Sequence, residues 1–319
     1  MKSLSSLVPL LKTFKGGEGS GFHGHAGRPG KRGGSAPASS SLGDFLEEVK
    51  FLETVPTLDD SMKDIWYCYQ RDFYDALEEG GIKLPINDDL KFVGLSNGGE
   101  AIKVKAEGEK ALNQALEEAG IRTTIPGEEK SVGYLLNKSW AHTSNNRGGY
   151  QDELQYYASQ KAKEAGLKTN ETDGMKRIKD NLENASSYHF QDEFTPNERQ
   201  QIAKIQYDTI KERTQKFLSE KGYGPEDSIV VYRGLRTSQI QKGQILTSEN
   251  FTQNPLSSWT VDPAIAHVFS DSQGKDSHVI AARVKIKDIF SSWETGFGCA
   301  SEHEFIIEPQ AIKAMKVLL

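Results

Sequence analysis

The hydrophobic pattern of the sequence changes close to Pro225, and this change limits the folds that the chain can adopt. Before it, apolar residues recur at helical spacing over 131–165, 174–186 and 196–221, the last of which starts at Thr195-Pro196 and stops at Gly222. After it come short apolar runs typical of strands: 228–235, 250–260, 278–286 and 304–319. A helical lobe followed by a run of strands predicts an α+β fold.

The N-terminal part divides into two further segments. Residues 16–43 are dominated by Gly, Ser, Ala and Pro, and they bury too little apolar surface to offset their ordering entropy, which indicates a flexible linker. After it, a helix with an aromatic stripe, a hairpin over 88–108 that turns at Asn97-Gly98, and a helix ending at Gly120 predict a small α+β unit. The expected domains are a flexible segment (1–43), this unit of unknown role (44–128) and a C-terminal domain (129–319).

Charge and composition narrow the classes of function. The 319 residues carry a net charge of −6, with a pI near 5.7, which argues against nucleic-acid binding driven by phosphate neutralisation. Two distant cysteines suit a reducing compartment, so the protein is expected to be cytoplasmic when made. No stretch reaches the roughly 18 apolar residues of a membrane span, and the scattered histidines predict no metal site. The first 15 residues read as a weak helix rather than a signal peptide, and secretion by a non-classical route stays open.

Arg233 ends the buried run "SIVVYRGL". A guanidinium in this position can bind a phosphate through two hydrogen bonds, and the following Gly234 would let a ligand approach the backbone. The structural alternative, a solvated arginine at a strand end, stays open on the residues alone.

Hydroxyl side chains end the next predicted strand, at Ser257, Ser258 and Thr260. A helix is predicted to follow from Asp262-Pro263, with Ala266 and Phe269 on its inner face. Hydroxyls in this position can orient a carboxylate or accompany an anion, and they can equally cap the turn.

Two carboxylates stand at the start of the last strand, in "EHEFII". Because side chains alternate along a strand, Glu302, Glu304 and Ile306 share one face, with the two carboxylates about 6.5 Å apart. Such a pair suits chemistry at a sugar carbon, where one carboxylate stabilises an oxocarbenium-like transition state and the other takes a proton. Mutual repulsion should raise one of the two pKa values, which favours a base. A solvated strand face is the structural alternative.

In this order, "YRGL", "SSWT" and "EHE" resemble the motifs of the Arg-Ser-Glu class of ADP-ribosyltransferases, enzymes that consume NAD. The resemblance covers about residues 130–319. It implies a pair of packed, roughly perpendicular β-sheets around an NAD cleft, with a helical lobe before them. The middle motif departs from the usual Ser-Thr-Ser, so both Ser258 and Ser257 can be read as the motif serine, with Ser258 preferred.

The resemblance also implies roles for the motif residues. Arg233 would contact the NAD phosphate next to the nicotinamide ribose, and the Gly234 backbone would hold the nicotinamide amide. Ser258, or Ser257, would position the catalytic Glu304, which binds the ribose and stabilises the oxocarbenium ion.

Glu302 would receive the acceptor and remove its proton, and a glutamate there resembles the arginine-modifying members. The loop 291–301 corresponds to the substrate-recognition loop, with Trp293 and Phe297 as contact aromatics. Phe269 belongs with the cofactor contacts, before a phosphate-nicotinamide loop over 270–277 that contains Lys275 but no arginine.

The expected function is therefore mono-ADP-ribosylation of a target-protein arginine, with NAD as the substrate and no metal. A NAD glycohydrolase is one alternative. The tract "GFHGHAGRPGKRGGS" resembles a stretch in minor head proteins of Mu-like phages, so the second alternative is a phage head-associated structural protein with an inactive transferase fold. This context predicts phage head components as partners, and a toxin or effector that is packaged in the virion, injected or secreted.

Overall fold

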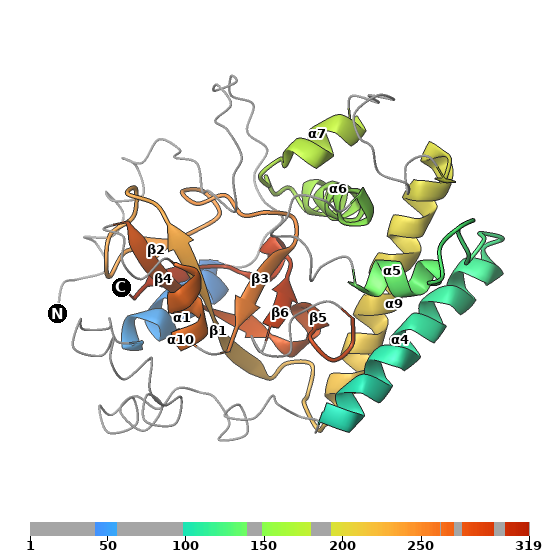
Figure 1. The fold of residues 1–319 in the computed structure, drawn as a ribbon. Helices are drawn as coiled ribbons and strands as arrows, with labels where there is room; N and C mark the ends of the chain where they lie inside the picture. Colours follow the sequence, from blue (N-terminus) through green and yellow to red (C-terminus); the bar gives the residue numbers. More distant parts are fainter. Residues whose placement is uncertain are drawn as a thin grey trace.

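The computed structural model describes residues 42–55, 98–138, 149–179, 193–261, 263–270, 276–296 and 304–318 (Figure 1). The α-helices are α1 (Leu42–Thr54), α4 (Gly98–Glu118), α5 (Val132–Lys138), α6 (Gly149–Glu164), α7 (Asp173–Lys179), α9 (Pro196–Glu220) and α10 (Pro263–Phe269). The strands are β1 (Ser228–Arg236), β2 (Ile245–Leu246), β3 (Ser257–Thr260), β4 (Ser277–Lys285), β5 (Ile289–Ser292), β6 (Glu304–Ile307) and β7 (Met315–Val317). The predicted α+β class is confirmed.

The helical lobe is organised around α9, whose ends follow the sequence signals. Thr195 and Glu198 form a capping box before the first turn, with Pro196 at the first helical position. Gly222 follows the helix with φ of +92°, a conformation that glycine adopts without a steric penalty. The buried side of α9 packs against both α4 and α6, so α9 joins the two sides of the lobe.

Helix α4 corrects the predicted hairpin. Residues 98–108 form the first half of this 21-residue helix instead of the end of a hairpin, while 88–97 lie outside the described residues. Ala, Glu, Lys and Leu dominate α4 as a whole, and their helix propensity outweighs the alternation of Ile102 and Val104 with lysines. Leu112 and Leu116 of α4 share a core with Val132 and Leu136 of α5, so this helix packs into the lobe across the predicted boundary at 128.

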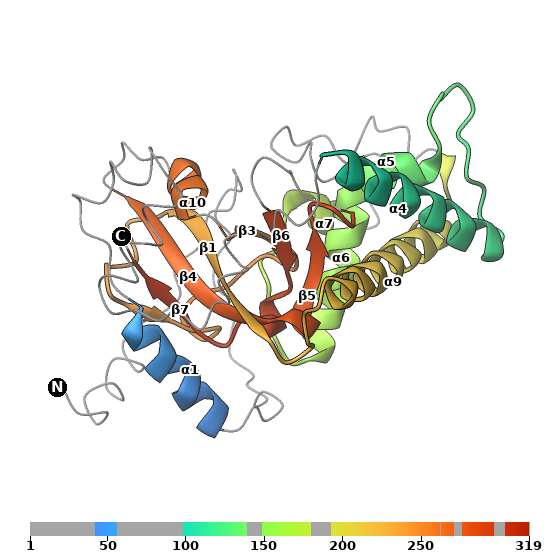
Figure 2. The same ribbon diagram turned by 90° about the horizontal axis from the view of Figure 1, so that it is seen from below.

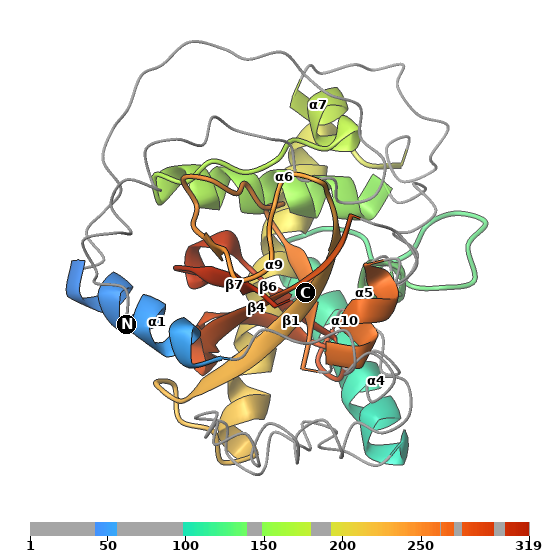
Figure 3. The same cartoon turned by 90° about the vertical axis from the view of Figure 1, so that its left-hand side faces the viewer.

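All seven described strands belong to one antiparallel sheet, in the order β2-β7-β4-β1-β3-β6-β5. Strands β1 and β4 pair over nine residues, but β1 and β3 meet at only one register pair, Tyr232↔Thr260. The sheet therefore consists of two wings, β2-β7-β4-β1 and β3-β6-β5. Figure 2 shows β7, β4 and β1 beside β3, β6 and β5, with α9 next to β5. Figure 3 shows α6, α1 and α10 on different sides of the strands.

Strand boundaries differ from the sequence prediction in two places. Only the last four residues of 250–260 form a strand, β3. The segment 304–319 divides into β6 and β7, because Pro309 starts a short 3-10 helix (η8, Pro309–Ala311) that interrupts pairing.

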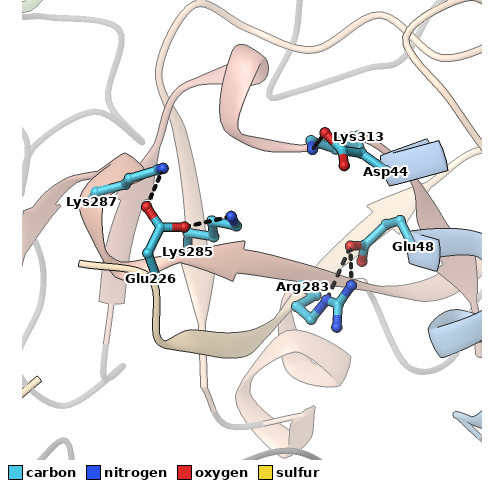
Figure 4. A network of polar contacts seen from close by, with 7 residues as sticks. All are labelled: Asp44, Glu48, Glu226, Arg283, Lys285, Lys287 and Lys313. Atoms are coloured by element: carbon cyan, nitrogen blue, oxygen red, sulfur yellow. Dashed lines mark hydrogen bonds and ion pairs between the residues drawn. The ribbon is translucent and has the colours of Figure 1, made fainter. Parts of the chain in front are cut away.

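Helix α1 lies against the first wing and is held there by charged groups (Figure 4). Glu48 binds Arg283 of β4 through two hydrogen bonds of 2.8 and 3.0 Å, and Asp44 binds Lys313 at 3.3 Å. Lys316 of β7 donates to the carbonyl of Val55 at the end of the helix. Helix α1 is thus anchored to strands β4 and β7 of the sheet.

Candidate functional site

The predicted motif residues lie on three neighbouring strands. Arg233 is on β1, Ser258 is on β3 and Glu304 is the first residue of β6, and these strands are adjacent in the sheet. The register joins them, because Tyr232 pairs with Thr260 and Thr260 pairs with Glu304. Residues that are far apart in the sequence therefore meet at the single-pair junction between the two wings.

Arg233 is partly buried at this junction. Its guanidinium carbon lies 6.0 Å from the centroid of the Trp259 ring, within the range of a cation–π contact. Burial lowers the pKa of Arg233 to about 10, and the charge of the nearby Glu304 carboxylate partly offsets this effect. The guanidinium stays charged at neutral pH, and it is close enough to Glu304 for the two charges to interact.

Gly234 has a structural role that the sequence did not reveal. A Cβ atom at this position would lie 2.5 Å from the amide nitrogen of Ser270 and 2.8 Å from the carbonyl carbon of Phe269, and closer still to the carbonyl oxygen of Ala266. All three atoms belong to the backbone at the end of α10. The absence of a side chain is therefore required by helix packing, independently of any ligand that approaches the backbone.

The register distinguishes the two candidate serines. Ser258 pairs with Ile306, and Thr260 pairs with Glu304, so Ser258 and Thr260 share the face of the sheet that carries Glu304. Ser257 lies on the opposite face and is only 2% exposed. The register therefore places Ser258, and not Ser257, on the face of Glu304, and the role of either serine stays a prediction.

Glu304 is held in a buried setting, with a relative exposure of 7%. Its backbone carbonyl accepts a hydrogen bond of 3.0 Å from Trp293, directly after β5. Ile306 and Phe305, which follow on β6, enter the cores on the two faces of the sheet. The carboxylate therefore projects from a strand that is fixed on both sides.

Trp293 requires a correction. It was expected to contact a target protein, but it is 3% exposed and packs edge-to-face on Phe305, with ring centroids 5.1 Å apart. Ser291 and Ser292 belong to β5, so the first part of the predicted recognition loop is a buried strand. We therefore do not retain Trp293 as a contact residue. Phe297 and Glu302 lie outside the described residues, and their roles stay predictions.

The two predicted inner residues of α10 have different environments. Ala266 is buried, as predicted, whereas Phe269 is 41% exposed, so its placement on the inner face was wrong. The following loop residues 271–275, including Lys275, lie outside the described residues.

Trp259 was not singled out from the sequence. Its indole Nε1 is buried, and it has no hydrogen-bond partner within the described part of the chain. A buried N–H group without an acceptor lowers the stability of the fold. The alternation in "SSWT" places Trp259 opposite Ser258 and Thr260, and this was the signal that could have identified it as a neighbour of the arginine.

The comparisons with known proteins give no family. No family model, curated protein or solved structure matches the chain. Within the described ranges, no group of three or more His, Cys, Asp or Glu side chains could hold a metal ion. In the same part of the chain, no helix has the length and apolar character needed to cross a membrane.

Proposed function

We propose that this protein is a mono-ADP-ribosyltransferase that moves ADP-ribose from NAD to an arginine of a target protein. The observation that carries the proposal is the meeting of Arg233, Ser258 and Glu304 on three adjacent strands. The charges of Arg233 and Glu304 are close enough to interact. The register places the Arg233 side chain on the face of Trp259 and places Ser258 and Glu304 on the other face, so the proposed site spans the edge between the two wings.

The chemistry of the cluster suits NAD. The guanidinium of Arg233 supplies charged donors for a phosphate, and Trp259 adds an N–H group without a partner among the described residues. The carboxylate of Glu304 suits the ribose, where positive charge develops as nicotinamide departs. Phe269 has an exposed aromatic ring, and its backbone lies against Gly234 at the end of α10.

In the proposed reaction, the bond between ribose C1′ and the nicotinamide nitrogen breaks, and nicotinamide leaves with the electron pair. Glu304 stabilises the resulting oxocarbenium-like ribose, and Ser258 orients this carboxylate. A guanidino nitrogen of the target arginine then bonds to C1′, and Glu302 accepts its proton. Nicotinamide and ADP-ribosyl-arginine are the products, and no metal takes part.

Two finer expectations belong to the same proposal. The two wings, joined at one register pair, are compatible with the pair of perpendicular sheets that the resemblance implies. The phage and effector context rests on the linker tract, which lies outside the described residues. In that context the enzyme would be packaged, injected or secreted to reach its target.

The test is turnover of labelled NAD by the purified wild type, with and without a small guanidine acceptor. Glu304→Gln should slow nicotinamide release on the order of 10²-fold or more, because it removes transition-state stabilisation. Glu302→Gln should lower acceptor labelling more than NAD hydrolysis. Glu249→Gln is the matched control, since this carboxylate is exposed between β2 and β3.

Each outcome assigns a function. Labelled acceptor that disappears in both site variants supports the transferase. Nicotinamide release without acceptor labelling would favour the glycohydrolase. Wild-type protein that does not turn over NAD would refute the proposal and favour the structural alternative.

A further inference from the structure

A side chain of the helical lobe binds the backbone directly before the serine strand. Gln155 of α6 donates from Nε2 to the carbonyl oxygen of Leu256 at 3.1 Å. The amide of Leu256 donates back to Oε1 of Gln155 at 2.9 Å. Both residues are buried, with 5% and 1% exposure. Gln155 thus provides hydrogen-bond partners for both the N–H and the C=O group of Leu256, the residue that precedes β3.

A second contact fixes the chain just upstream. The backbone amide of Asn170 donates to the carbonyl of Gln253 at 2.8 Å, and its Nδ2 donates to the carbonyl of Thr252 at 3.1 Å. Asn170 lies between α6 and α7, so this contact also comes from the helical lobe. The approach to β3 is therefore held from one side by the lobe.

We propose that Gln155 is a positioning residue for the serine strand. An amide side chain carries a donor and an acceptor in one plane, so it can replace a neighbouring strand at Leu256. The position of β3 in turn affects the position of β6, because Ser258 pairs with Ile306 and Thr260 pairs with Glu304. Gln155 thereby sets where the serine and the carboxylate stand relative to Arg233.

The need for such a contact follows from the sheet. Strand β3 pairs with β1 at one position only, so the main-chain ladder does not fix the distance between the Arg233 strand and the Ser258 strand. Hydrogen bonds from α6 supply the missing constraint. The catalytic consequence rests on the proposed function, whereas the effect on the position of β3 does not.

The first measurement is amide hydrogen exchange, which needs no activity. Gln155→Met keeps the length of the side chain but removes both hydrogen bonds. We expect exchange at Leu256 and along β3 to accelerate about tenfold or more, with β1 and β4 unchanged. Gln160→Met on the same helix is the control, because its amide donates to the neighbouring Ser159.

Gln155→Glu is a second variant, in which protonation at low pH should restore the lost hydrogen bond. Its carboxylate can accept from the Leu256 amide but cannot donate to the Leu256 carbonyl, whereas the protonated acid can do both. Relative to wild type at the same pH, exchange in β3 should be faster near neutrality and return towards wild type as the pH falls. A purely packing role would give no such recovery.

The second measurement is the kinetics of nicotinamide release. We expect kcat to fall about tenfold to a hundredfold in Gln155→Met, with KM for NAD changed less than about threefold, because Arg233 on β1 is not displaced. Faster exchange confined to Leu256, equal acceleration in β1 and β4, or an unchanged kcat would overturn the positioning role. A wild type without NAD turnover would refute the proposed function, and the exchange data would still decide the role of Gln155.

Discussion

The close approach of α10 to β1 makes Gly234→Ala a sharp test of the fold around the site. The added methyl group would meet three backbone atoms, of Ala266, Phe269 and Ser270, at distances below 3 Å. Backbone atoms cannot rotate away as side chains do, so either the helix or the strand must shift. Overpacking of this kind costs about 3 kcal/mol, near the upper end of the usual range.

The assay is thermal and denaturant unfolding of Gly234→Ala beside a matched variant. A loss of about 3 kcal/mol corresponds to a fall in Tm of about 6–12 °C for a domain of this size. Gly224→Ala is the control, because its methyl group would meet only the side chain of Asp227, at 3.3 Å. If Gly234→Ala unfolds within about 0.5 kcal/mol of the control, α10 does not approach β1 as described, and the reasoning fails.

Two further predictions concern buried titratable groups, Tyr207 and the ion pair of Glu48 with Arg283. Burial and the hydrogen-bonded Glu308 raise the pKa of Tyr207, so the folded protein keeps a proton that the unfolded chain loses above about pH 10. The free energy of unfolding should therefore fall as the pH rises past about 10, and Tyr207→Phe should flatten this fall in denaturant titrations. Arg283→Met leaves the Glu48 carboxylate buried without its ion pair and should cost about 3 kcal/mol, the low end of the usual range because Arg283 is partly exposed. Adding Glu48→Gln should recover part of this loss, and a double-mutant cycle that shows simple additivity would contradict the pairing.

The parts of the fold that the sequence predicts are those that local signals determine. Thr195-Pro196 and Gly222 bound α9, because capping geometry depends only on neighbouring residues. The β-branched run before Arg233 forms β1, and the "EFII" segment forms β6, because strands of this composition pack on both faces.

The errors arise where tertiary contacts decide. Residues 98–108 carry both a strand-like alternation and helix-favouring residues, and the packing of α4 on α5 and α9 selects the helix. Trp293 looks like a loop aromatic, but the pairing of β5 with β6 carries it into the core beside Phe305. Gln155 gave no sequence signal, because a single polar residue on a helix does not reveal which backbone it will bind.

The position of the candidate site depends on packing more than on the main-chain ladder. The wings meet at the pair Tyr232↔Thr260, so hydrogen bonding between β1 and β3 is minimal where the motif residues gather. Two contacts fill this gap from different sides: α10 packs onto Gly234, and Gln155 holds the residue before β3. A substitution at either contact should therefore alter the spacing between Arg233 and Glu304 although neither changes a predicted catalytic side chain. The effects of Gly234→Ala and Gln155→Met on the rate of nicotinamide release should therefore add only if the two wings move independently of each other.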